Sequence, residues 1–95
     1  MSKVIVVFTE DIKDPEGMAA YGKAAMPTLA NGVKVLAVDA SPRTLEGEWH
    51  GTQTVILEFE SEEAVRAWYD SPEYQAAAKL RHAAADSNAA IITAF

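Results

Sequence analysis

Arg81 is the side chain whose position most strongly suggests chemistry. Pro72 lacks a backbone N–H and disfavours helical geometry at the residue before it, so a helix is predicted to begin at Pro72 with Ser71 as its N-cap. At about 100° per residue, Arg81 falls on the apolar side of this helix, beside Tyr74. A guanidinium buried there needs a carboxylate, carbonyls or an anionic ligand, because an unpaired buried charge is costly.

The rest of this helix divides into a polar stripe and an apolar arc. The stripe consists of Gln75, Lys79, His82 and Asp86. The arc consists of Tyr74, Ala77, Ala78, Leu80, Ala84 and Ala85. His82 precedes Asp86 by one turn, so an i,i+4 contact accounts for it without any catalytic role.

Three aromatic residues are candidates for a binding pocket together with Arg81. Trp68, Tyr74 and Tyr21 are expected to line a cleft between the helices and a sheet, with Arg81 binding a small anionic ligand. The alternative is that Arg81 is paired internally and that the aromatic rings are simply core residues.

The segment 41–51 is rich in turn formers and charged residues, and it is predicted to be a long connection. Glu46 and His50 are candidates for acid–base catalysis, and Trp49 for closing a lid over a ligand. Alternatively, the segment is a solvated loop whose Trp49 docks on a partner subunit.

Metal and cofactor chemistry find little support. The chain has no cysteine and two histidines, which fall on separate elements. That is not a known metal-ligand spacing, so no metal site is expected. The phosphate-binding loops, the dinucleotide fingerprint and the nucleophile-elbow motif are all missing, and no cofactor is expected.

Bulk composition limits the possible partners. The 95 residues, 49% of them hydrophobic, predict one domain over 1–95. A net charge of −6 disfavours nucleic acids and anionic membrane surfaces. The apolar runs 4–8 and 89–94 are too short to cross a bilayer, which needs about 20 residues. No leader sequence is recognised, and the cysteine-free chain fits a cytoplasmic protein.

Periodicity and capping residues define the expected elements. Strands are expected at residues 3–9, 33–39, 52–59 and 89–95. Helices are expected to follow the N-caps Asp14, Ser61 and Ser71. Pro27 is expected to kink or end the first helix near Met26, and Asn31-Gly32 to supply its left-handed C-cap.

This element order predicts a fold and an assembly. Strand, helix, strand, strand, helix pair, strand is typical of an α+β ferredoxin-like βαββαβ sandwich, here with its second helix broken at Pro72. Right-handed crossovers put the helices on one face of a four-stranded antiparallel sheet. The first strand is apolar on both faces, with Val6 on one side and Val7 on the other. A second copy is therefore expected to cover the open sheet face, giving a homodimer.

Three segments carry a resemblance to a known family. LEGEWHG, TVILEFES and AVRAWYDSPEYQAAAKLR are similar to the domain-of-unknown-function 1330 family, which belongs to the dimeric α/β-barrel superfamily. The resemblance implies a ferredoxin-like fold and a dimer, but no established activity. Related families include cofactor-free monooxygenases, muconolactone-isomerase-like enzymes and haem-dependent enzymes, so the fold does not select a reaction.

Two hypotheses about function remain open. In the first, the protein is a dimeric small-molecule-binding protein or a cofactor-free enzyme. The resemblance then implies a small organic acid or phenolic compound, with Arg81 holding a carboxylate or enolate, Tyr74 and Tyr21 orienting it, and His50 or Glu46 moving protons. In the second, the protein is a non-catalytic dimerisation module without a ligand.

Overall fold

The computed structural model describes residues 3–30 and 32–94, and its elements follow the order expected from the sequence. The strands are β1 (Val4–Ile12), β2 (Lys34–Asp39), β3 (Gln53–Phe59) and β4 (Ala85–Thr93). The helices are α1 (Pro15–Ala25), α2 (Glu62–Tyr69) and α3 (Pro72–Ala84), and a 3-10 turn (Met26–Thr28) follows α1.

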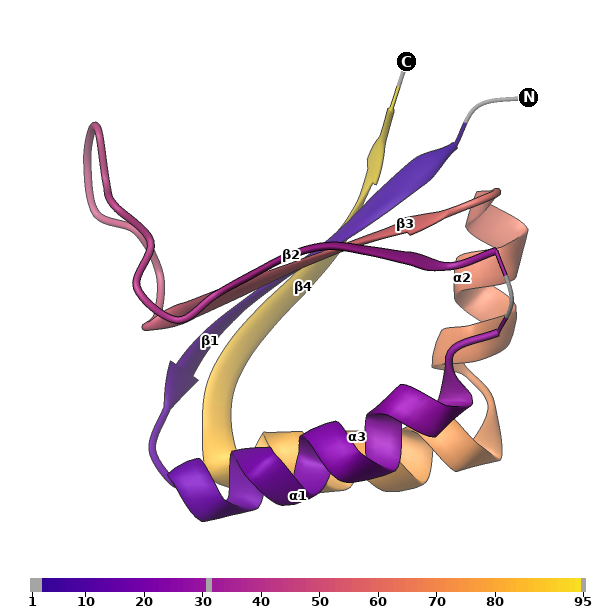
Figure 1. The fold of residues 1–95 in the computed structure, drawn as a ribbon, viewed down its shortest axis with the longest axis horizontal. Coiled ribbons are helices and arrows are strands. Elements are labelled where there is room, and N and C mark those ends of the chain that lie inside the picture. Colours follow the sequence, from indigo (N-terminus) through magenta and orange to yellow (C-terminus); the bar gives the residue numbers. More distant parts are fainter. Residues whose placement is uncertain (1–2, 31, 95) are drawn as a thin grey trace.

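The four strands form one antiparallel sheet in the order β2-β3-β1-β4. Helices α1 and α3 lie side by side against one face of this sheet, with α2 at one end (Figure 1). This is the predicted ferredoxin-like arrangement, with helices on one face and β1 and β3 at the centre of the sheet.

The core lies between the helices and the sheet. Burial alternates along β1, where Val4, Val6 and Phe8 are buried beneath the helices and Ile5 and Val7 face the other side. The remaining hydrophobic members of this core are Ala25, Leu57, Phe59, Val65, Trp68, Tyr74, Ala77 and Ala78. The face opposite the helices, carried at its centre by Val7 and its cross-strand neighbours Ile56 and Ala90, is called the open face below.

The helix starts agree closely with the capping analysis. The Ser61 hydroxyl accepts a hydrogen bond from the Ala64 N–H, and the Ser71 hydroxyl accepts one from the Tyr74 N–H. Asp14 precedes α1 as predicted, but its side chain makes no capping hydrogen bond. Because Pro15 at the first helical position already lacks an N–H, fewer donors need a cap there.

The end of β1 and the start of β4 differ from the prediction. β1 continues past Thr9 to Ile12, and β4 begins at Ala85 directly after α3 instead of at residue 89. The cause is cross-strand pairing, which extends to Ile12 opposite Ala85 and overrides the weak strand preference of acidic residues. Asp86 is therefore a strand residue, and its expected place on the helical polar stripe is wrong.

Three further expectations concern one residue of α3 and the end of the first helix. Leu80 was expected in the apolar arc of α3 but is 40% exposed. Pro27 ends regular helix as predicted, because the chain tightens into the 3-10 turn there. Gly32 has a positive φ of 94°, but it does not cap the helix as expected, because the 3-10 turn already ends at Thr28 with Leu29 as its C-cap; Asn31 lies outside the described residues.

The long connection between β2 and β3 carries no helix or strand, as expected, and it projects beyond the end of the sheet (Figure 1).

Among the described residues, no helix has the length and apolar character needed to cross a membrane.

Candidate functional site

A row of polar side chains crosses the helix-covered face of the sheet. Glu10 on β1 is paired in register with Gln53 on β3 and with Ser87 on β4. All three lie on the same face as Phe8, because side chains two residues apart in a strand point the same way. The row therefore places polar groups where the rest of that face is hydrophobic.

Glu10 is the most deeply placed member of this row. It is 1% exposed, and its Oε1 atom accepts a hydrogen bond of 2.9 Å from the Gln53 side-chain amide. Glu10 is not among the site residues expected from the sequence, because β1 was expected to end at Thr9. The available signal was the spacing of two from Val4, Val6 and Phe8, which continues to residue 10.

Next to this row lies a cavity of about 190 Å³ between α1, the 3-10 turn and the sheet. Its wall is mostly hydrophobic, and Glu10 and Gln53 are the polar aliphatic residues in it. The other lining residues are Phe8, Met18, Tyr21, Gly22, Ala25, Met26, Leu29, Val35, Val38, Val55, Leu57 and Trp68. Met26, Val35 and Val38 are substantially exposed, so the cavity opens to solvent beside β2.

Two of the predicted binding residues, Tyr21 and Trp68, line this cavity. Tyr74 is fully buried and supports both of them. Its hydroxyl shares a hydrogen bond of 2.8 Å with that of Tyr21, and its ring centroid is 4.0 Å from that of Trp68. Burial, and then the hydrogen bond with Tyr74, raise the pKa of Tyr21 well above its ordinary value. The Trp68 indole donates to the Thr28 hydroxyl at 2.9 Å.

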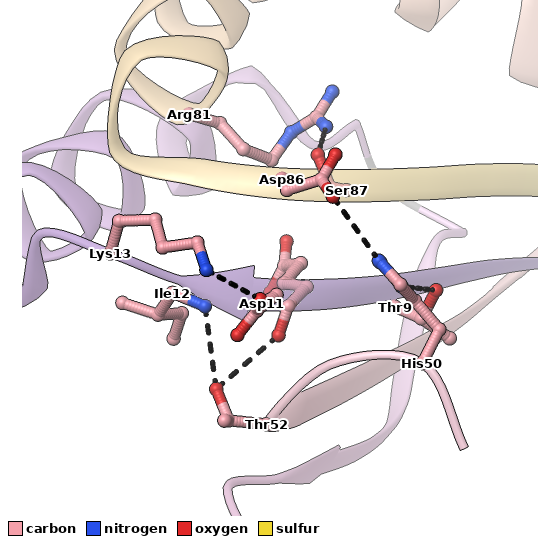
Figure 2. A network of polar contacts seen from close by, with 10 residues as sticks. Thr9, Asp11, Ile12, Lys13, His50, Thr52, Arg81, Asp86 and Ser87 are labelled. Carbon is pink, nitrogen blue, oxygen red and sulfur yellow. Dashed lines mark hydrogen bonds and ion pairs between the residues drawn. The ribbon is translucent and has the colours of Figure 1, made fainter. Parts of the chain in front are cut away.

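Arg81 is buried as its position on α3 predicts, with 2% of its surface exposed. Its Nη1 donates to the Ser87 hydroxyl (Figure 2), and its guanidinium lies 5.0 Å from the ring centroid of Phe8 and 5.6 Å from that of Tyr21. Its Nε has no hydrogen-bond partner among the described residues. Arg81 thus contacts two wall residues, while the cavity surface itself is formed by their rings.

The two predicted acid–base residues lie apart from this cavity. His50 sits on the open face, where its Nδ1 shares a hydrogen bond of 2.7 Å with the Thr9 hydroxyl and its Nε2 lies 3.8 Å from an Asp86 carboxylate oxygen (Figure 2). Glu46 is exposed in the 41–51 connection. The acid beside His50 is therefore Asp86, a residue that the sequence analysis placed on a helix.

Trp49 also belongs to the open face. Its indole N–H donates to the Thr54 hydroxyl at 2.8 Å, and it covers Thr54, which is only 7% exposed. The Trp49 ring itself remains 51% exposed.

Within residues 3–30 and 32–94, no group of three or more His, Cys, Asp or Glu side chains is placed to hold a metal ion.

A second groove runs between α2 and β4. Its volume is larger, at about 470 Å³. Glu62 and Arg66, which form an exposed ion pair, are among its lining residues. This groove contains no buried polar side chain, whereas the cavity beside Glu10 combines a hydrophobic wall with a buried carboxylate. The cavity beside Glu10 is therefore the better candidate for specific binding.

Fold and cavity together define a ferredoxin-like protein with a small, mostly hydrophobic pocket between its helices and its sheet. The chain belongs to the family described as Domain of unknown function (DUF1330), which matches residues 3–95. No curated protein matches this sequence.

Solved structures show the same fold. A protein of unknown function from Rhodopseudomonas palustris is 24% identical with a TM-score of 0.82, over 99% of this chain and 83% of that one. A dimeric ferredoxin-like protein of unknown function from Thermobifida fusca is 18% identical with a TM-score of 0.70, over 98% and 92% of the two chains. SnoaB from Streptomyces nogalater, a cofactor-independent oxygenase, is 15% identical with a TM-score of 0.71, over 100% and 95%.

Proposed function

We propose that this protein is a homodimer that binds a small organic molecule in the cavity between α1 and the sheet. The observation that carries the proposal is the cavity itself, whose hydrophobic wall surrounds a carboxylate that is 1% exposed. Such a combination gives a ligand an apolar surface to pack against and a polar group that fixes its orientation. In this proposal Tyr21 and Trp68 contact the ligand, and Tyr74 and Arg81 hold those two rings in place.

The finer proposal is a cofactor-free enzyme acting on a small organic acid or a phenolic compound. Its support is the likeness in fold to a cofactor-independent oxygenase, together with the aromatic side chains in the cavity wall. His50 and Glu46 lie apart from the cavity, so this proposal assigns them no proton transfer to a ligand bound there. A cytoplasmic location belongs to the same proposal and is supported by the cysteine-free sequence.

The homodimer is proposed to form through the open face. Val7 at the centre of that face has Ile56 and Ala90 as cross-strand neighbours, and Ile92 nearby is 49% exposed. A second sheet packed there removes this apolar surface from water, which stabilises the pair. The Thermobifida fusca protein of the same fold is described as dimeric, which supports the proposal.

Ligand binding is tested by filling the cavity. Gly22 lines it, and a Cβ atom at this position meets no other atom within 4 Å. Gly22→Leu therefore extends a side chain into open space, and it also replaces a poor helix former in α1. Toluene is a suitable neutral probe, and its binding is measured by chemical-shift titration and by the shift of the melting temperature.

We expect toluene to bind the wild type and to lose at least tenfold in affinity in Gly22→Leu, whose melting temperature stays equal or rises. Ala20→Leu places the same side chain at an exposed position of the same helix, and this variant should bind toluene like the wild type. If the wild type binds neither toluene nor a toluene derivative that carries a polar group, the proposal fails, and the alternative of a dimerisation module without a ligand is preferred.

A further inference from the structure

Glu10 has acceptor capacity that its protein contacts do not use. A carboxylate offers about four lone-pair sites, and the hydrogen bond recorded to this side chain is the one from the Gln53 amide to Oε1. Within residues 3–30 and 32–94, no Lys, Arg or His nitrogen forms an ion pair with Glu10. A carboxylate that lines a cavity with unused lone pairs and no ion pair is suited to accept a hydrogen bond from a ligand that enters the cavity.

The charge near Glu10 limits which ligands fit. A carboxylate ligand that enters this cavity meets a second carboxylate in a poorly hydrated space, and that repulsion is costly. A cationic ligand comes close to the buried Arg81 guanidinium, which packs against the Phe8 and Tyr21 rings of the wall and donates to Ser87, the cross-strand neighbour of Glu10. A neutral hydrogen-bond donor avoids both penalties.

The wall of the cavity determines the body of the ligand. Phe8, Tyr21 and Trp68 present aromatic rings to it, which favours a flat ring over a flexible chain. We propose that the ligand is a neutral phenol, whose hydroxyl donates a hydrogen bond to the Glu10 carboxylate while its ring packs between α1 and the sheet. This inference rests on the proposed binding function and selects the phenolic compound over the organic acid.

Four probes that differ in a single group test the proposal: p-cresol, toluene, 4-methylbenzoate and 4-methylbenzylamine. Dissociation constants are measured for each by chemical-shift titration of the wild type at neutral pH. We expect p-cresol to bind about tenfold more tightly than toluene, because a hydrogen bond to a charged acceptor is worth about that factor. The benzoate and the amine should bind more weakly than p-cresol.

Glu10→Gln removes the charge while keeping the shape of the side chain. We expect it to reduce the preference for p-cresol over toluene from about tenfold to less than threefold. Glu58→Gln is the matched control, because Glu58 lies on the opposite face of the same sheet and pairs with Lys3. In the wild type, the chemical shift of the Gln53 side-chain amide should change more on addition of p-cresol than on addition of toluene.

The outcomes separate this inference from the proposed function. Equal binding of toluene and p-cresol overturns the phenol assignment and leaves the binding cavity intact. Tightest binding of the benzoate or of the amine also overturns it, in favour of an anionic or cationic ligand. If none of the four probes binds, the proposed function itself is wrong. Because the wild-type comparison needs no variant, the test holds even if Glu10→Gln folds poorly.

Discussion

The hydroxyls of Tyr21 and Tyr74 lie 2.8 Å apart and join α1 to α3 across the middle of the helical layer. Their rings meet edge to face, with centroids 6.3 Å apart and an interplanar angle of 77°. Tyr21 faces the cavity on one side and the Arg81 guanidinium on the other. This pair therefore connects the buried Arg81 with the cavity wall.

Alkaline pH should weaken the fold through Tyr21. Burial, followed by the hydrogen bond with Tyr74, raises the pKa of Tyr21 above its ordinary value of 10.0, so the unfolded chain releases this proton first. The stabilisation is complete below about pH 10 and is lost as the pH rises further, by at most about 1.4 kcal/mol per pH unit. Urea unfolding between pH 8 and 11 measures it.

The variant Tyr21→Phe isolates this contribution. It should unfold at lower urea at pH 8, since it leaves Tyr74 without its hydroxyl partner, and its stability should depend less steeply on pH above 10 than that of the wild type. An identical slope in both proteins would show that other groups cause the alkaline loss.

Arg81→Lys should be costly although it preserves the charge. Lysine lacks the planar fork that donates to Ser87 while stacking over Phe8 and Tyr21. We expect the free energy of unfolding to fall by about 2–4 kcal/mol, measured by urea denaturation. Arg43→Lys is the control, because the Arg43 side chain is 86% exposed and the same change there should cost less than about 0.5 kcal/mol.

Gly51 closes the long connection against the end of β1. Its φ is +83°, and a methyl group at this position would lie 2.5 Å from the Glu10 carbonyl oxygen. Gly51→Ala should therefore destabilise the protein by more than about 2 kcal/mol, through a backbone clash as well as an unfavourable φ. Gly47→Ala shares the positive φ but meets no atom within 4 Å, so it should cost only about 1 kcal/mol. Similar melting temperatures for the two variants would contradict this assignment.

The proposed dimer should dissociate when a charge is placed on the open face. Val7→Lys puts an ammonium group between Ile56 and Ala90, where a second sheet would have to bury it. Light scattering after size-exclusion chromatography at micromolar concentration should give twice the chain mass for the wild type and the chain mass for the variant. Ala76→Lys, on the exposed side of α3, should remain dimeric. A monomeric wild type would refute the dimer.

The sequence predicted those parts of the fold that depend on local signals. Ser61, Ser71 and Pro72 set helix starts through capping and a missing N–H, and the burial of Arg81 and Tyr74 followed from helical periodicity. Strand ends were predicted less well, because they depend on partners far away in the chain. Glu10 has low strand preference, and it is held in β1 by pairing with Gln53 and Ser87.

The same limitation affected the candidate site. Tyr21 and Trp68 were identified as candidate ligand-binding residues and lie in the cavity wall, whereas Glu10 was overlooked as its polar group. The pairing of His50 with Asp86 was also missed, because Asp86 was assigned to a helix that in fact ends at Ala84. Contacts of this kind arise only once the sheet has assembled, so a pattern within one segment cannot show them.

The polar row of Gln53, Glu10 and Ser87 also bears on how the chain avoids misfolding. If β1 slid by one residue against its neighbours, Glu10 would leave Gln53 and turn toward the opposite side of the sheet, while Thr9 and Asp11 would enter the hydrophobic interior. Such a slip would bury the Asp11 carboxylate among the apolar side chains beneath the helices. The acidic residues at this end of β1 thus penalise a one-residue misalignment of the three strands, a safeguard that a strand end made of hydrocarbon side chains would lack.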